Sequence, residues 1–187
     1  TGSRVTLEGL DMSDPQGDKA VLGILQEMGC QVTEGADGVT VAGPEGAFSA
    51  DAGCARASLS GGTFDLNAIP DALPALAVTA CFAGEPVELV NVPQARAKET
   101  DRIAVMAAEL SKMGARVEEL SDGLRVRPRA GDPAGAGAPG TAGAAKADAP
   151  PLTGTAVHGH HDHRVVMALS VAGLAAAGET TVDTAEA

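Results

Sequence analysis

The chain repeats one set of short motifs at a nearly constant spacing. Met28-Gly29 recurs as Met113-Gly114, an offset of 85 residues (113 − 28), and an Asp-Gly pair at 37–38 recurs at the same offset at 122–123. An Ala-Gly-Glu triplet at 83–85 returns at 177–179, an offset of 94 (177 − 83). Such spacing predicts two copies of one structural unit, with extra residues inserted in the second copy.

Periodicity predicts the same elements in both copies: a helix, a hairpin, a strand, an apolar helix and a strand. The first copy is expected at 17–28, 31–34 with 39–41, 64–66, 71–83 and 87–90, after a strand at 5–8. The second is expected at 101–113, 116–120 with 124–126, 155–157, 165–177 and 180–183. The segments 71–83 and 165–177 are apolar on almost every side, which is typical of buried helices. The sequence therefore predicts an α/β fold with helices inside and sheets outside.

A segment of different composition interrupts the second copy. Of the 22 residues at 130–151, 18 are Ala, Gly or Pro. They offer no large side chain whose burial could offset the entropy of ordering the chain. We interpret the whole chain, 1–187, as one domain carrying a flexible surface insertion at 130–151.

Composition excludes several classes of function. The net charge is −12, which disfavours nucleic acid and anionic membranes as partners. Three cysteines without metal-binding spacing (Cys30, Cys54 and Cys81) indicate reduced thiols and a cytoplasmic location. The first ten residues lack the apolar stretch of a signal peptide, and the longest apolar run, 165–177, is too short to span a membrane.

Basic residues cluster in the middle of the chain. Arg125, Arg127 and Arg129 alternate, which we interpret as the charged edge of a sheet. The segment 96–102 (Arg-Ala-Lys-Glu-Thr-Asp-Arg) leads into a helix, with Thr100 as the expected N-cap. Cations at a helix N-terminus suit a phosphorylated or carboxylated ligand, whereas the alternative is a solvated surface network.

Two further segments carry candidate site residues. All four histidines lie at 158–163, which permits a metal-binding alternative, although neighbouring loop residues seldom converge on one ion. Arg164 follows them at the start of a buried helix, where Asp162 is expected to hold it. Asp71 starts the equivalent helix of the first copy, either as a helix cap or as one wall of a ligand cleft shared with Arg164.

These motifs together resemble 5-enolpyruvylshikimate-3-phosphate synthase. The resemblance rests on Lys98-Glu99-Thr100-Asp101-Arg102, with the following 106–110 and 113–115, and on three shorter motifs in the same order: Gln16-Gly17-Asp18, Ile69-Pro70-Asp71-Ala72 and Asp162-His163-Arg164. It implies an enolpyruvyl transferase-like fold of repeated βαβαββ units. Because family members are more than twice as long, it also implies that this chain is most of a C-terminal domain, with the N-terminal domain as its partner.

The resemblance also implies a reaction, transfer of the carboxyvinyl group of phosphoenolpyruvate to the 5-hydroxyl of shikimate 3-phosphate. Asp71 would accept the hydroxyl proton, and Glu99 and Lys98 would assist proton transfer. Arg102 and Arg164 would bind phosphoenolpyruvate, so Arg102→Ala is expected to weaken that binding by about 2–3 kcal/mol. Gln94 would contact the shikimate ring, and His163 would support Arg164. No metal or other cofactor is implied.

Three alternatives stay open from the sequence. The chain could belong to an enzyme like UDP-N-acetylglucosamine enolpyruvyl transferase, which shares the fold but differs at the Lys98–Arg102 and Asp162–Arg164 motifs. It could be a non-catalytic anion-binding domain of the same fold, which would not need Asp71 and Glu99 together. It could also bind a metal through 158–163.

Overall fold

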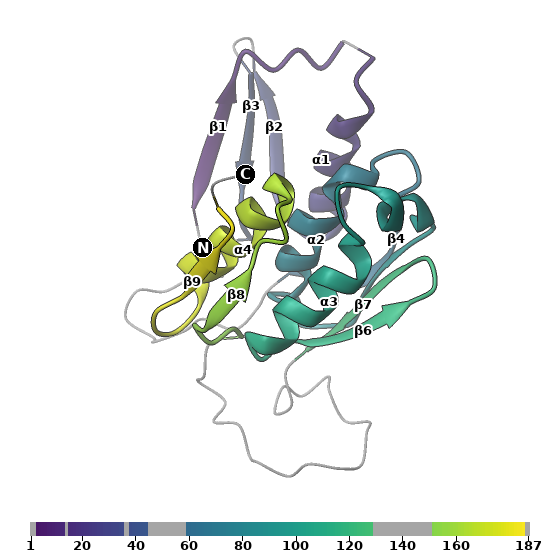
Figure 1. Cartoon of the computed structure of the whole chain (residues 1–187). Coiled ribbons are helices and arrows are strands. Elements are labelled where there is room, and N and C mark those ends of the chain that lie inside the picture. The colour runs from purple at the N-terminus through teal and green to yellow at the C-terminus, as the bar shows by residue number, and fades with distance from the viewer. Residues whose placement is uncertain (1–2, 14, 36–37, 45–58, 129–150, 186–187) are drawn as a thin grey trace.

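The computed structural model describes residues 3–13, 15–35, 38–44, 59–128 and 151–185 (Figure 1). Its elements run in the order β1 (Arg4–Glu8), the 3-10 helix η1 (Gly17–Lys19), α1 (Ala20–Glu27), β2 (Gln31–Gly35), β3 (Gly38–Ala42), β4 (Gly62–Asp65), η2 (Pro70–Ala72), α2 (Leu73–Ala80), β5 (Val87–Val90), η3 (Pro93–Ala97), α3 (Arg102–Lys112), β6 (Arg116–Leu120), β7 (Gly123–Arg127), β8 (Ala156–His158), α4 (His163–Ala175) and β9 (Thr181–Asp183). The predicted insertion, apart from Pro151, lies outside the described residues, as do Asp37, Cys54 and Arg129.

The two predicted copies are present in the structure. Helix α1 with the β2–β3 hairpin matches α3 with the β6–β7 hairpin, and both hairpins are antiparallel. The β4–α2–β5 segment matches β8–α4–β9, and in both the two strands pair in parallel. From β4 to β7 the elements follow the order β4–α2–β5–α3–β6–β7, which is one uninterrupted βαβαββ unit. The structural unit therefore begins at β4, whereas the sequence repeat was predicted to begin at the helix before each hairpin.

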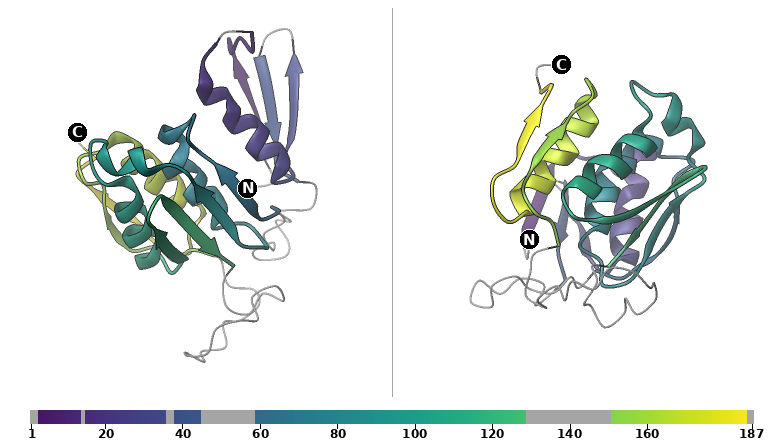
Figure 2. Two further views of the ribbon diagram at one scale, coloured as in Figure 1. Left: turned by 90° about the vertical axis from the view of Figure 1, so that its right-hand side faces the viewer. Right: turned by 60° about the horizontal axis from the view of Figure 1, so that its bottom comes forward.

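The strands of the described residues form three sheets that pack against the helices. Their orders are β1-β3-β2, β4-β5-β7-β6 and β8-β9. Figure 1 shows α2, α3 and α4 side by side, with the four-stranded sheet behind α2 and α3, and Figure 2 shows the first sheet and α1 standing to one side. Helices therefore lie inside and sheets outside, as the sequence predicts.

The two apolar helices differ in how completely they are covered. Helix α2 buries six of its eight residues, including Leu73 and Ala77 at 0% exposure. Helix α4 buries only Val165, Ala168, Leu169 and Ala172, while Met167, Val171 and Leu174 are exposed and Leu174 is 89% exposed. The prediction of a buried helix is confirmed for most of α2, where Ala75 is exposed, and it is wrong for one face of α4.

The repeated glycines allow close packing between strands. A Cβ on Gly123 would lie 1.9 Å from the carbonyl oxygen of Leu89 in β5, and a Cβ on Gly38 would lie 2.0 Å from that of Leu7 in β1. These distances are far shorter than van der Waals contact. Glycine recurs at the start of β3 and β7 because each strand begins directly against the backbone of its neighbour.

The prediction that the alternating arginines mark a sheet edge is wrong. Strand β7 lies between β5 and β6, so it is an inner strand. Arg125 pairs with Glu88 at 2.7 Å and with Glu118 at 3.0 Å, and Arg127 also pairs with Glu118 at 2.9 Å. Alternating charges arise here because they form cross-strand ion pairs on the solvent face.

No helix among the described residues has the length and apolar character needed to cross a membrane.

Candidate active site

The candidate site lies where α2, α3 and α4 begin. The three helices descend together from one end of the molecule (Figure 1), and side chains from all three N-terminal ends are in contact. Pro70 opens the 3-10 turn that carries Asp71 into α2, a position where its fixed backbone and missing N–H are tolerated. The positive ends of three helix dipoles therefore point toward the same region, which favours bound anions.

Helices α3 and α4 are both capped by aspartates. The side chain of Asp101 accepts the N–H of Ala104 at 3.0 Å, so Asp101 is the N-cap and the prediction of Thr100 is wrong. Asp162 accepts the N–H groups of Arg164 at 2.9 Å and Val165 at 3.4 Å. These caps fix where each helix starts and thus where its first side chains lie.

Arg102 is the centre of the site. Its side chain is 1% exposed, and its Nε donates to Asp162 Oδ2 at 2.7 Å. Its Nη1 donates to Asp71 Oδ1 at 2.8 Å, and its Nη2 donates to Glu99 Oε2 at 2.6 Å. The planar guanidinium therefore holds three carboxylates from three segments in one arrangement, as its fork of donors allows.

Asp71 is the second node of the network. Besides Arg102, it contacts Lys98 Nζ at 3.1 Å and Arg164 Nη2 at 3.1 Å. The prediction that Asp71 and Arg164 emerge at neighbouring helix starts is confirmed. We call the six connected side chains the ionic cluster: Asp71, Lys98, Glu99, Arg102, Asp162 and Arg164.

Two carboxylates of the cluster, Asp71 and Asp162, are stabilised as anions. Burial alone would raise the pKa of Asp71, but the hydrogen bond from Lys98 and the charges of Arg164, Lys98 and Arg102 outweigh it and lower the pKa below its ordinary value of 3.8. Burial likewise opposes ionisation of Asp162, yet hydrogen bonds from Arg102 and the helix backbone lower its pKa. Both groups are therefore ionised at neutral pH.

The cluster has a buried floor and an open face. Arg102 and Asp162 are 1% and 0% exposed, whereas Lys98, Glu99 and Arg164 are between 31% and 48% exposed. Three carboxylates balance three cations. An anionic ligand reaching the open face would thus exchange places with carboxylates that already satisfy the cations.

Comparison with known proteins identifies the family. The family model for EPSP synthase (3-phosphoshikimate 1-carboxyvinyltransferase) matches residues 1–187. The chain belongs to the EPSP synthase family. In this chain, the segments that suggested the resemblance meet in the ionic cluster: Lys98–Arg102, Asp71 and Asp162–Arg164.

Individual relatives agree with this assignment. The chain is 48% identical over 183 residues to the 3-phosphoshikimate 1-carboxyvinyltransferase of Ruminiclostridium cellulolyticum, covering 98% of this chain and 35% of the relative. It is 46% identical to the protein of the same name from Acetivibrio thermocellus, covering 100% of this chain and 36% of the relative. The chain thus spans about a third of the length of these relatives.

Solved structures show the same fold. An EPSP synthase from Acinetobacter baumannii superposes with a TM-score of 0.73 at 28% identity, over 99% of this chain and 38% of that one. The enolpyruvyl transferase NikO from Streptomyces tendae has a TM-score of 0.63 at 22% identity, over 98% of this chain and 34% of that one, and this likeness concerns the fold alone. The predicted enolpyruvyl transferase-like α/β fold is confirmed.

Gln94 and His163, two residues that the EPSP synthase motifs suggested, lie beside the cluster without joining it. The Gln94 amide donates from Nε2 to the backbone oxygen of Asn67 at 2.9 Å, just before the turn that carries Asp71. His163 is exposed at the first residue of α4. The prediction that Asp162 holds the Arg164 side chain is wrong, because Asp162 binds the Arg164 backbone while the guanidinium reaches Asp71.

Arg96 is a supporting residue that the sequence analysis placed only in a basic cluster. It pairs with Asp101 and Glu119 at 2.8 Å and donates to the carbonyl oxygens of Leu120 and Ser121. These contacts anchor the segment between η3 and α3 to the β6–β7 hairpin. Because Lys98 and Glu99 lie on this segment, Arg96 supports two members of the cluster.

The histidine segment shows no ligand set for a metal. Among residues 3–13, 15–35, 38–44, 59–128 and 151–185, no group of three or more His, Cys, Asp or Glu side chains could hold an ion. His160 instead contacts Glu109 through Nε2 at 3.0 Å, and His158 accepts the backbone N–H of His160.

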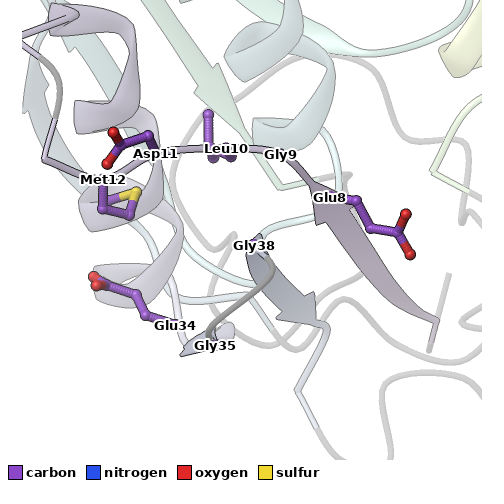
Figure 3. Close-up of a pocket in the computed structure, with 8 residues that line it drawn as sticks. All are labelled: Glu8, Gly9, Leu10, Asp11, Met12, Glu34, Gly35 and Gly38. Carbon is purple, nitrogen blue, oxygen red and sulfur yellow. The ribbon is translucent and has the colours of Figure 1, made fainter.

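A hollow of about 750 Å³ opens near the end of the first sheet (Figure 3). Its walls are Glu8, Gly9, Leu10, Asp11, Met12, Glu34, Gly35 and Gly38. Figure 3 shows Glu8 on the opposite side from Asp11 and Glu34, so the three carboxylates do not face a common point. Its wall contains no basic side chain among the described residues, which makes it a poor place for an anionic substrate of an EPSP synthase.

Proposed function

We propose that this chain supplies part of the active site of an enzyme that transfers the carboxyvinyl group of phosphoenolpyruvate to shikimate 3-phosphate and releases phosphate. The observation that carries the proposal is the contact of Asp71 with both Arg102 and Arg164. It joins a candidate base to two candidate anion-binding groups drawn from three separate segments. Family membership and the names of the relatives support the same reaction.

The proposed chemistry is an addition followed by an elimination. Asp71 accepts the proton of the 5-hydroxyl while the hydroxyl oxygen bonds to C2 of phosphoenolpyruvate, and Glu99 takes a proton from Lys98 and delivers it to C3. In the elimination C3 returns a proton to Glu99, phosphate leaves from C2 with the proton that Asp71 held, and the double bond is restored in the product. Arg102 and Arg164 hold the carboxylate and phosphate, because guanidinium groups bind both in fork geometry. Gln94 is proposed to contact the shikimate ring. No step requires a metal or another cofactor.

The contacts of Asp71 suggest how substrate binding prepares the base. Without substrate, three cations contact this carboxylate, and its lowered pKa makes it a weak proton acceptor. Phosphoenolpyruvate would draw Arg164 and Lys98, both about one-third exposed, toward its own charges. The pKa of Asp71 would then rise toward its ordinary value, so that the base gains strength only when its co-substrate is present.

Charge balance supports a second part of the protein at this site. Both substrates carry a phosphate and a carboxylate, whereas the ionic cluster is neutral as three carboxylates and three cations. Holding both anions requires further positive groups, since buried or enclosed charge needs compensation. We infer that an N-terminal domain of the same enzyme supplies them and that residues 1–187 form most of the C-terminal domain.

The surface of α4 supports the same view of a larger protein. Met167, Val171 and Leu174 follow each other at helical spacing and form an exposed apolar stripe. Stripes of this kind usually mark contact with another part of a protein.

The reduced thiols of Cys30 and Cys81 agree with the cytoplasmic location that we propose for the enzyme.

The test uses the full-length protein encoded by the complete reading frame. We expect it to release phosphate from phosphoenolpyruvate in the presence of shikimate 3-phosphate, and Asp71→Asn to abolish that release while the fold is retained. A parallel assay replaces shikimate 3-phosphate with UDP-N-acetylglucosamine, which the alternative enzyme class would use. Absence of phosphate release with shikimate 3-phosphate, or full activity of Asp71→Asn, would overturn the proposal.

A further inference from the structure

One buried carboxylate outside the ionic cluster has no role in the proposed reaction. Glu109 is 2% exposed and lies on α3 seven residues after Arg102, two helical turns along the same face. A buried carboxylate is costly unless its charge is compensated. Its partners therefore indicate what the residue is for.

Glu109 is held by three groups, two of them from the segment that precedes α4. Its Oε2 accepts the backbone N–H of His158 at 3.0 Å, and its Oε1 contacts His160 Nε2 at 3.0 Å. Lys112 Nζ donates to both oxygens at 2.8 Å. Burial opposes ionisation, but the contacts with His160, Lys112 and His158 lower the pKa of Glu109 below its ordinary value, so it is an anion at neutral pH.

The segment that Glu109 holds has an uncommon backbone. His160 and His161 have φ angles of 54° and 55°, the left-handed region that residues with side chains enter at a cost. The turn closes with the N–H of Asp162 donating to the oxygen of Gly159 at 3.0 Å. A strained turn of this kind persists only when neighbouring groups hold it in place. Glu109 contacts His158, just before the turn, and His160, within it.

We propose that Glu109 is a positioning residue for the anion-binding arginines. Helix α3 grips the segment 158–162 at two points, through Arg102 at Asp162 and through Glu109 at His158 and His160. Asp162 starts α4, and the next residues include Arg164, which contacts Asp71. Without the second point, the turn relaxes, and Asp162 and Arg164 shift relative to Asp71. This inference rests on the proposed function, because it assigns Arg164 to phosphoenolpyruvate.

The kinetic test compares Glu109 variants of the full-length enzyme with two matched controls. We expect Glu109→Gln to raise the KM for phosphoenolpyruvate about tenfold, because small misplacements of binding groups have large effects, and Glu109→Ala to raise it further. The KM for shikimate 3-phosphate should change by less than about twofold. Lys112→Gln removes the outer, half-exposed partner of Glu109, and Glu118→Gln removes ion pairs on the distant sheet face. Both controls should leave the two KM values close to those of the wild type.

A double substitution separates positioning from general stability. If Glu109 acts through His160, then Glu109→Gln combined with His160→Leu should raise the KM for phosphoenolpyruvate no more than the larger of the two single effects. A purely structural role predicts a lower Tm for every variant, with unchanged KM values for the folded enzyme. That result, or equal KM effects in Glu109→Gln and Glu118→Gln, would overturn the inference.

Crystal structures of the full-length wild type and of Glu109→Gln give a readout that does not depend on activity. We expect the Arg164 Nη2 to Asp71 Oδ2 distance to grow beyond about 3.5 Å in the variant, outside hydrogen-bond range. An unchanged turn at 158–162 would refute the positioning role even if the wild type is active. A wild type without carboxyvinyl transfer would refute the proposed function, while the two crystal structures would still decide whether Glu109 fixes the turn.

Discussion

Replacing Arg102 with methionine tests how the ionic cluster is built. Methionine has a similar length but no charge, so the change removes the ion pairs to Asp162, Asp71 and Glu99 while filling much of the same space. Asp71 and Glu99 are partly exposed and can be solvated by water. Asp162 is fully buried, and it keeps only its hydrogen bonds from the backbone N–H groups of Arg164 and Val165.

The expected loss follows from the fate of Asp162. Removing one partner of a buried ion pair typically costs about 3–5 kcal/mol, because the other charge stays buried without compensation. Two backbone hydrogen bonds remain on Asp162, so we expect a loss near the lower end, about 3 kcal/mol in the free energy of unfolding. The predicted weakening of phosphoenolpyruvate binding in Arg102→Ala must therefore be measured on folded protein, since the same residue also stabilises the fold.

Urea unfolding at neutral pH measures the effect, with Asp162→Asn as the second member of a double-mutant cycle. Asparagine keeps an oxygen that can cap α4 but carries no charge. The double variant, Arg102→Met with Asp162→Asn, should therefore be more stable than Arg102→Met alone, by about 1 kcal/mol or more. If Arg102→Met unfolds within about 0.5 kcal/mol of the wild type, or if the two losses simply add, the buried pair is not what holds the cluster together.

Three further outcomes are expected. Asp71→Asn should lower kcat of the full-length enzyme by at least about a hundredfold in a phosphate-release assay, because an amide cannot accept the hydroxyl proton, and it should also lower the Tm modestly, because the Asp71 carboxylate pairs with Lys98, Arg102 and Arg164. Folding lowers the pKa values of Asp71 and Asp162 from 3.8 and that of Glu109 from 4.5. Their contribution to stability is therefore complete above these ordinary pKa values and is lost as the pH falls through the lower pKa values of the folded protein. The urea midpoint should hold steady down to about pH 5 and decline below it. Gly123→Ala should lower the free energy of unfolding by about 2 kcal/mol or more through its clash with Leu89. Gly23→Ala should raise it by about 0.5–1 kcal/mol, because Gly23 lies within α1 and a Cβ there would meet nothing within 4 Å. Thermal unfolding measures both.

Local patterns predicted most of the fold. Helices and hairpins followed from periodicity and from the paired Gly motifs, because these depend on residues close together in the chain. The strand Val87–Val90 has the bounds that its sequence predicts. The N-cap of α3 was predicted at Thr100 and lies one residue later, at Asp101, whose side chain accepts the N–H of Ala104. Arg96 pairs with Asp101 from the preceding turn.

Long-range partners were harder to predict. The ion pair of Arg102 with Asp162 joins residues 60 positions apart and exists only because α3 packs against α4. The sequence placed both residues near a site but assigned Asp162 to its neighbour Arg164. Similarly, alternating arginines on β7 fit both an exposed edge and a cross-strand ladder, and only the strand order distinguishes the two. Glu109 entered the sequence analysis only as part of the 106–110 motif, and its burial could not be predicted because it depends on the same helix contact.

The cluster combines one buried cation with two partly exposed ones, and this difference bears on how it would bind anions. Arg102 is locked by Asp162 on the buried side, so its orientation toward the open face is set before a ligand arrives. Lys98 and Arg164 are more exposed and are held by Asp71, a carboxylate that a ligand can replace. A ligand with a single negative group would displace Asp71 from only one of these two cations. A ligand with two negative groups, as we propose for phosphoenolpyruvate, would satisfy both and leave Asp71 paired with Arg102 alone. Under the proposed function, binding of a doubly anionic ligand would thus reduce the cations around the proposed base from three to one.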